Sequence, residues 1–420
     1  MSRQTTLHIL RAAIGQLWTI ALIVTILTFT VTGQTPTVEE RERGSGEVHL
    51  GRDEGVLRHF RELSERLREV ETIPVIVRLR EDGRHSGGDE LPGEITGYDA
   101  GSVKRFKYIP YLALRIDRSG LEQLRGSARV VDIQEDHAVH PGIVSRGRAV
   151  TGFESRMVGG GGNGRAIALI GGAIDRSHPE LAGRLVAEGC YSTADGARGI
   201  GSLCVAEERT DCGVAGTSCE VETARALLAA GRESLAPRAT LISLQIFSRV
   251  ERGEGCPDGQ AGCLIAFDSD VIRALERVYE LRQQHQIGAV SLNLSNLRVA
   301  DNCDESRSAM REALALLGRG GLTTVVAEER GAGGRTCGGG TISPAQLPGF
   351  GGEAAELAGL LVAGRETLAG SLADSPLAVE LQRVLGSQTK QQAKQQAKQQ
   401  AKRQAKRQAK RQLPWESKNI

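Results

Sequence analysis

Short apolar runs alternate with amphipathic helical patterns through the second half of the chain. Four nearly continuous apolar runs have the length of buried strands: Ala166 to Ile170, Ala239 to Phe247, Gly288 to Leu294 and Leu322 to Ala327. Apolar residues at helical spacing occur between and after them: Val221 to Ala230, Asp270 to Gln284, Ser306 to Leu317, Ala354 to Ala363 and Pro376 to Leu385. Strands that are apolar all round suit a parallel sheet covered by helices. The pattern predicts a doubly wound α/β domain over residues 160–388, with helices on both faces of the sheet.

A different rhythm marks the residues before that domain. Val56 to Val70 has helical spacing, and Ile73 to Arg80 alternates apolar and charged side chains, as a half-exposed strand does. Three further elements follow a polar, glycine-rich interval: a strand at Tyr108 to Ile116, a helix at Ser119 to Arg125 capped by Ser119, and a strand at Val130 to Gln134. Together these elements predict a small α+β domain over residues 56–145.

The N-terminus carries the pattern of an export signal. Arg3 and Arg11 precede an apolar run from Leu17 to Val31, and small residues stand just before Gln34, as signal peptidase requires. The pattern predicts a cleaved signal peptide over residues 1–33, followed by a polar linker over 34–55. The alternative is an uncleaved membrane anchor, because Ala12 to Gly33 approaches the roughly 20 residues that a spanning helix needs.

The eight cysteines all lie beyond residue 150. An even number of cysteines behind an export signal indicates disulfides and a secreted or periplasmic protein. A metal site is the weaker alternative, because no CxxC pair occurs and no histidine lies at ligand spacing from a cysteine pair. The sequence predicts neither a metal nor a cofactor. The sequence does not fix the connectivity. The simplest pairing, of neighbours along the chain, joins Cys190 to Cys204, Cys212 to Cys219, Cys256 to Cys263 and Cys303 to Cys337.

The composition is that of a globular protein followed by a basic tail. Charged residues make up 25% and hydrophobic residues 40% of the chain, which excludes a wholly disordered protein. The formal net charge of +2 conceals the tail over 389–420, where nine basic residues lie between Lys390 and Arg411 in KQQA and KRQA repeats. In one interpretation this stripe binds a polyanion or an anionic membrane surface; in the other it is a solvated repeat without a partner.

Several segments of the larger domain occur in a characteristic order. Residues 167–181 (IALIGGAIDRSHPEL) join an apolar strand to a His-Pro-Glu-Leu turn, and the next segments are 235–247 (LAPRATLISLQIF), 289–295 (AVSLNLS), 324–327 (TVVA) and 343–349 (SPAQLPG). In this order they resemble landmarks of the subtilisin-like serine peptidases, the subtilases. Residues 73–141 resemble the subtilase propeptide, an inhibitor and folding chaperone of the peptidase domain. The resemblance implies a subtilisin-like fold preceded by a propeptide-like domain.

The same resemblance locates the catalytic positions, and none of them holds a catalytic residue. A subtilase needs an Asp that orients a His, a His that accepts the proton of a Ser, and donors for the oxyanion. The Asp position falls on Gly171, the His position on Val221 and the Ser position on Gly351. The oxyanion Asn position falls on Gly331, or on Arg330 if the register shifts by one residue.

These substitutions favour an exported pseudoprotease that binds or regulates without catalysis, with a peptide in the former substrate cleft as its expected partner. Two alternatives stay open: a residual serine endopeptidase with an unrecognised triad, and a decaying gene product with no selected function. Glu220, Glu222 and Arg225, close to the former His position, are interpreted as a polar, solvated helix face. His178 is interpreted as a structural residue of its turn.

Overall fold

The computed structural model describes residues 57–80, 91–142, 161–206, 209–210, 212, 217–232, 234, 236–251, 256, 262–295, 307–326 and 341–342. Several predictions fall outside these residues: the signal peptide, the linker, the helices predicted at Ala354 to Ala363 and Pro376 to Leu385, the basic tail, Arg330, Gly331, Gly351, Cys303 and Cys337.

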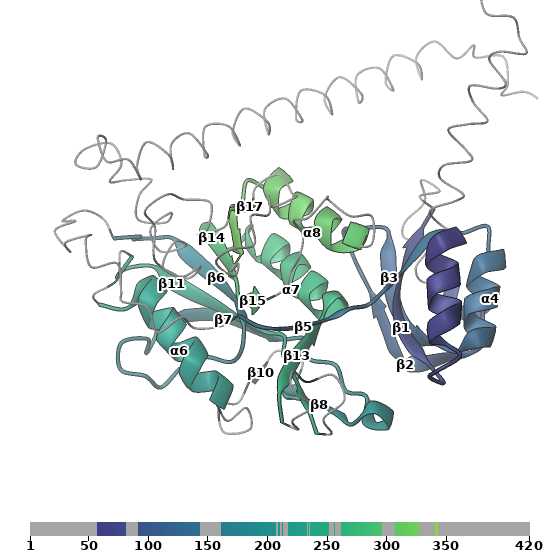
Figure 1. Cartoon of the computed structure of the whole chain (residues 1–420). Helices are drawn as coiled ribbons and strands as arrows, with labels where there is room; N and C mark the ends of the chain where they lie inside the picture. The colour runs from purple at the N-terminus through teal and green to yellow at the C-terminus, as the bar shows by residue number, and fades with distance from the viewer. Residues whose placement is uncertain are drawn as a thin grey trace, which may run out of the picture. The chain divides into compact units, whose positions relative to one another are not determined.

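A six-stranded parallel sheet forms the centre of the larger domain (Figure 1). Its strands are β6 (Ala166–Gly171), β7 (Leu185–Cys190), β11 (Thr240–Gln245), β14 (Ile287–Leu292), β16 (Thr324–Val326) and β17 (Thr341–Ile342). They lie in the order β17-β16-β14-β6-β11-β7, and every neighbouring pair is parallel. Strands β6 and β14 are buried along their whole length, as their apolar sequences predict. The predicted α/β class is confirmed.

Helices cover both faces of this sheet, as predicted. They are α6 (Thr217–Ala230), α7 (Asp268–Leu281) and α8 (Ser308–Arg319). The even-numbered residues of β6 share a hydrophobic core with α7 and α8, whereas Gly171 on the opposite face of β6 meets Glu222 of α6. Because side chains alternate across a strand, α6 and α7 lie on opposite faces. Helix α6 lies on the connection from β7 to β11, and α7 on the connection from β11 to β14; both connections move along the sheet towards β17. Because the two helices lie on opposite faces, the two crossovers have opposite hands, and one is therefore of the rare left-handed kind.

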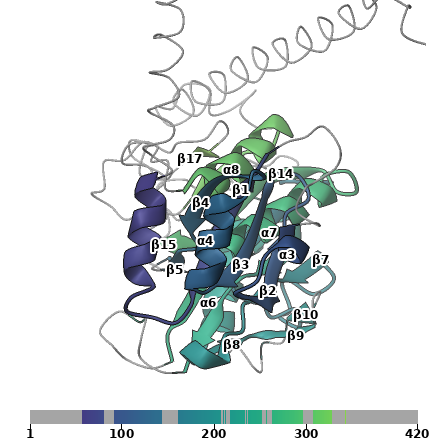
Figure 2. The same ribbon diagram turned by 90° about the vertical axis from the view of Figure 1, so that its right-hand side faces the viewer.

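The small domain is built on a four-stranded antiparallel sheet in the order β2-β3-β1-β4. Its strands are β1 (Ile73–Leu79), β2 (Tyr98–Arg105), β3 (Tyr111–Ile116) and β4 (Val130–Glu135). Residues 57–66 are helical, and α3 (Leu91–Glu94) and α4 (Arg118–Gly126) complete the domain (Figure 2). Side chains from β1 and β3 belong to the same core as α7 and α8, so one face of the small sheet packs on these two helices.

Two details of the small domain differ from the sequence prediction. Strand β2 lies in the interval that was interpreted as polar and glycine-rich without an element. None of its residues is buried, so it lacks the apolar pattern by which a strand is recognised. Helix α4 is capped by Asp117 and not by Ser119, because the Asp117 side chain accepts a hydrogen bond from the amide of Gly120.

A second sheet joins the two domains, in the order β15-β5-β13-β12-β8. Its strands are β5 (Ala138–Pro141), β8 (Ile200–Ser202), β12 (Ser248–Val250), β13 (Leu264–Phe267) and β15 (Leu294–Ser295). Strand β5 directly follows the small domain and lies between β13 and β15, antiparallel to both. The end of the small domain is therefore hydrogen-bonded into the larger one.

Three disulfides join the cysteine neighbours predicted to pair. They are Cys190–Cys204, Cys212–Cys219 and Cys256–Cys263, with Cα atoms 5.6, 5.4 and 5.8 Å apart. These pairs are confirmed, and they fit a protein that folds in an oxidising compartment.

Candidate functional site at the carboxyl ends of the parallel strands

The order of strands marks one point of the sheet as a natural binding site. Strand β6 connects to the edge strand β7 on one side, whereas its neighbour β14 connects onward to β16 on the other side. Connections that leave adjacent parallel strands in opposite directions open a crevice beyond their carboxyl ends. Gly171 ends β6 at this point, and Asn293 directly follows β14.

A buried carboxylate fills the space beside Gly171. A Cβ atom on Gly171 would lie 2.8 Å from Oε2 of Glu222, closer than real Cβ atoms approach another atom. Glu222 lies on α6, and its side chain is 6% exposed. Glycine at position 171 is therefore the residue that leaves room for this carboxylate.

Glu222 is the centre of a buried polar cluster, which we call the Glu222 cluster and define as Glu222, Arg225 and Asn293. Oε1 of Glu222 accepts hydrogen bonds from Arg225 Nη1 at 2.8 Å and from Asn293 Nδ2 at 2.6 Å. Burial raises the pKa of Glu222, and the charge of Arg225, the Gly172 amide and Asn293 offset part of that rise. The ion pair with Arg225 and the further hydrogen bonds compensate the cost of burying the Glu222 carboxylate.

The Glu222 cluster also fastens the end of strand β5. Arg225 Nη2 donates a 2.7 Å hydrogen bond to the carbonyl of Gly142, the residue after β5. The amide of Gly142 donates to the carbonyl of Asn293 at 3.4 Å. Arg225 and Asn293 thus both form hydrogen bonds with the backbone of Gly142. The cluster therefore links α6 and the end of β14 to strand β5, which follows the small domain.

Strand β5 lies between the edges of β13 and β15, and we call this position between the two strands the groove. Val139 and Ala138 pair with Ala266 and Phe267 of β13, and on the other side Pro141 pairs with Leu294 of β15. Addition of an extended segment to exposed strand edges is a common mode of peptide recognition. Here the segment that fills the groove belongs to the chain itself.

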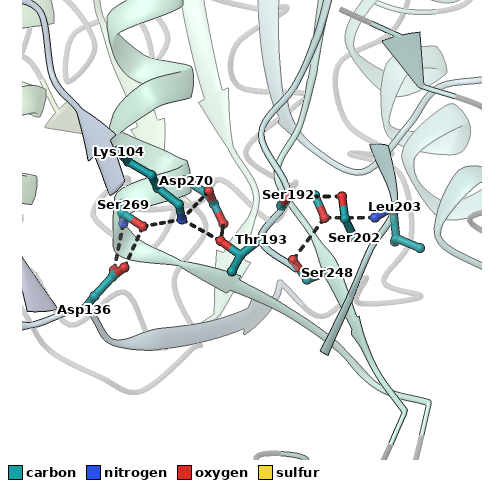
Figure 3. Close-up of polar contacts among 9 residues, drawn as sticks. All are labelled: Lys104, Asp136, Ser192, Thr193, Ser202, Leu203, Ser248, Ser269 and Asp270. Carbon is teal, nitrogen blue, oxygen red and sulfur yellow. Dashed lines mark hydrogen bonds and ion pairs between the residues drawn. The ribbon is translucent and has the colours of Figure 1, made fainter. Parts of the chain in front are cut away.

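Polar contacts just before β5 hold the small domain at the start of α7 (Figure 3). Asp136 accepts hydrogen bonds from the amide of Ser269 at 2.9 Å and from its hydroxyl at 2.6 Å. A carboxylate in this position satisfies free amides of the first helical turn and suits the helix dipole. Lys104 of β2 adds bonds to Ser269 and Asp270, each at 2.7 Å.

Helix α8 receives a matching contact. Oε1 of Gln134 accepts from the Ser308 hydroxyl at 2.9 Å and from the amide of Ala309 at 3.3 Å. The small domain therefore supplies polar partners to the N-terminal turns of both helices on which it packs.

The structure brings together one of the predicted positions with residues that the sequence interpretation had set aside. Gly171 lies in the site, whereas Val221 is 37% exposed on α6, and its neighbour Glu222 faces Gly171 instead. The interpretation of a solvated helix face is right for Glu220, which is exposed, and wrong for Glu222 and Arg225, which are buried. The helix spacing of three residues allows their ion pair, but its burial depends on Asn293 and Gly171, which are distant in sequence.

The chemistry of the cluster is restricted by its members. Among the described residues, the Glu222 carboxylate accepts hydrogen bonds from Arg225, Asn293 and the Gly172 amide, and no serine or histidine hydrogen-bonds to it. His178 lies in its turn, where Nδ1 accepts from the amide of Glu180 at 3.3 Å. The cluster thus offers a fixed carboxylate and a fixed guanidinium, both already paired.

Two further searches cover the described ranges only. They contain no group of three His, Cys, Asp or Glu side chains arranged to hold a metal ion. Within the same ranges, no helix has the length and apolar character needed to cross a membrane.

No protein-family model and no curated protein matches this sequence. Solved structures of subtilisin-like proteases are similar to it. Fervidolysin from Fervidobacterium pennivorans, a keratinolytic enzyme related to subtilisin, is 13% identical over 65% of this chain and 42% of its own, with a TM-score of 0.40. Sphericase is 16% identical over 43% and 53%, with a TM-score of 0.27. MycP1 from Mycobacterium smegmatis is 16% identical over 49% and 51%, with a TM-score of 0.25. The chain spans about half the length of these proteases.

Proposed function

We propose that this chain is an exported, non-catalytic protein of the subtilisin-like type, whose peptide groove is permanently filled by its own strand β5. The ordered sequence motifs support the subtilisin-like type, and the three disulfides support export. The partner of the groove is then the chain itself, and its role is binding or regulation rather than peptide hydrolysis.

The Glu222 cluster is the observation that carries this proposal. In a serine peptidase of this type, the carboxyl end of the strand that holds Gly171 needs an Asp that orients a His. Here a paired Glu222 carboxylate takes up the space that an Asp side chain would need, and Arg225 holds the chain at Gly142. Peptide hydrolysis needs a nucleophile activated by a base. The cluster contains no serine, cysteine or histidine, and its carboxylate is already bonded to Arg225 and Asn293.

An activity assay on purified, disulfide-intact protein tests the proposal. The protein is incubated with casein and a panel of peptide esters, beside an active subtilisin-like protease at equal concentration, and both are treated with a serine-directed fluorophosphonate label. We expect turnover and labelling of the active protease only. Turnover by this chain that the fluorophosphonate abolishes would contradict the proposal.

A further inference from the structure

A cavity of about 400 Å³ lies apart from the Glu222 cluster, where β2 and β3 of the small domain meet residues 192–195 and the first turns of α7. Its volume falls within the range of small-molecule sites. Ala194 and Arg198 on its wall are exposed, so a solute reaches it from solvent. Phe267 forms part of the apolar lining.

Two basic side chains of the cavity are held in place by acidic partners. Lys104 Nζ donates to Thr193 Oγ1 at 2.5 Å, and to Ser269 and Asp270 (Figure 3). Arg115 bridges Asp99 and Asp195. Because Lys104 and Arg115 are already bonded to protein groups, they form the wall of the cavity, and their charges are largely neutralised by their acidic partners.

Two further arginines have charge to offer. The guanidinium carbon of Arg198 lies 5.9 Å from the ring centre of Phe267, and that of Arg273 lies 5.0 Å from the ring centre of Tyr191. Within the described part of the chain, neither forms an ion pair with a carboxylate. A guanidinium that stacks on an aromatic face keeps its edge N–H groups free for bidentate bonds to a carboxylate or phosphate.

The two carboxylates on the cavity wall do not compete for these arginines. Asp136 accepts both hydrogen bonds of Ser269. Asp195 pairs with Arg115 and accepts from the backbone amide of Arg198. The unpaired charge that faces the cavity is therefore positive.

We infer that this cavity binds a small organic or inorganic anion with at least two oxyanion groups, carboxylate or phosphate, which bridges Arg198 and Arg273. Such a ligand touches the wall formed by β2 as well as the larger domain, so its binding also stabilises the docked small domain. This inference is independent of whether the chain hydrolyses peptides.

Isothermal titration of the full-length protein with citrate and, separately, with pyrophosphate tests the inference. We expect saturable binding of at least one anion, weakened about tenfold or more in Arg273→Gln and in Arg198→Gln, because each change removes a charge-assisted hydrogen bond. Arg125→Gln is the matched control, since Arg125 is exposed on α4 with a 3.7 Å contact to Glu122. The basic tail is present in every variant, so its contribution cancels.

The outcomes distinguish binding of the anion in the cavity from binding by surface charge in general. Binding of citrate alone identifies a carboxylate ligand, and binding of pyrophosphate alone a phosphate ligand. No binding of either anion, or equal weakening in Arg125→Gln and Arg273→Gln, would overturn the inference. If Arg273→Gln melts below the wild type, the exposed Arg198→Gln variant carries the test.

Discussion

At the scale of the residue, the glycine at position 171 determines which side chain can lie at the end of strand β6. Glycine there ends a fully buried strand and leaves the volume that the Glu222 carboxylate occupies. The carboxylate in turn requires Arg225 and Asn293, because an unpaired buried charge is strongly destabilising. The four residues form one unit in which each depends on the others.

Gly171→Ala is expected to lower the free energy of unfolding by about 1–3 kcal/mol, because the added methyl group overlaps the Glu222 carboxylate. Urea denaturation measures the change. Gly196→Ala is the control, since nothing lies within 4 Å of a Cβ at that position. In a double-mutant cycle with Glu222→Ala, the combined loss should be smaller than the sum of the two single losses. Strict additivity would show that the two positions do not share this space.

Asp268 predicts a pH dependence of stability. It is fully buried at the start of α7, and burial raises its pKa from 3.8 to about 7, with the charge of Arg307 opposing and that of Asp136 assisting the rise. Between about pH 4 and pH 7 the folded protein therefore holds a proton that the unfolded chain has lost. Folding stability must fall as the pH rises through this window.

The Asp268→Asn variant removes this titration. Relative to the variant, the wild type should lose about 1–4 kcal/mol of unfolding free energy between pH 4.5 and pH 8. Urea denaturation of both proteins at the two pH values gives the difference, and comparison with the variant removes the contributions of all other groups. Parallel pH profiles would show that Asp268 is ionised throughout.

At the scale of elements, the sequence predicted four of the six strands of the parallel sheet, namely β6, β11, β14 and β16. It did not predict β7, β17 or the contacts that join the domains. Strands such as β6 and β14 are recognisable because short continuous apolar runs are typical of parallel strands that are buried on both faces. Strand β5 has four residues and no periodic pattern, so only its partners β13 and β15 define it. Strand β2 is missed for a related reason, since none of its residues is buried.

The same distinction applies to the candidate site. The sequence resemblance located Gly171, because it ends an apolar strand before a recognisable turn. It did not identify Glu222 as buried, since a charged residue on a helix is normally solvated and its partners at 171 and 293 lie far away in sequence. The disulfides were predictable where neighbours pair, as the confirmed Cys190–Cys204 bridge shows.

Asp136→Ala tests the docking of the small domain on α7. The change removes two hydrogen bonds to Ser269 at the helix start, and we expect a loss of about 1–2 kcal/mol in the free energy of unfolding. Glu122→Ala is the control, because its exposed 3.7 Å contact with Arg125 should contribute little. Equal stability of Asp136→Ala and wild type would mean that these bonds do not support the docking.

At the scale of the whole molecule, the small and the larger domain are joined by a shared hydrophobic core and by strand β5. The small sheet shares a core with α7 and α8, and β5 is the central element between β13 and β15. Under the proposed function the chain has no means of cutting itself after this strand, so β5 is expected to stay attached and to keep its place between β13 and β15.

Intact-mass measurement of the protein, made in a host without extracellular proteases, tests the central claim most directly. The account predicts one species in which the small and the large domain remain joined in a single chain, unchanged after prolonged incubation. A clean break near residues 140–150 that persists in purified protein, and that a serine-directed inhibitor prevents, would contradict it.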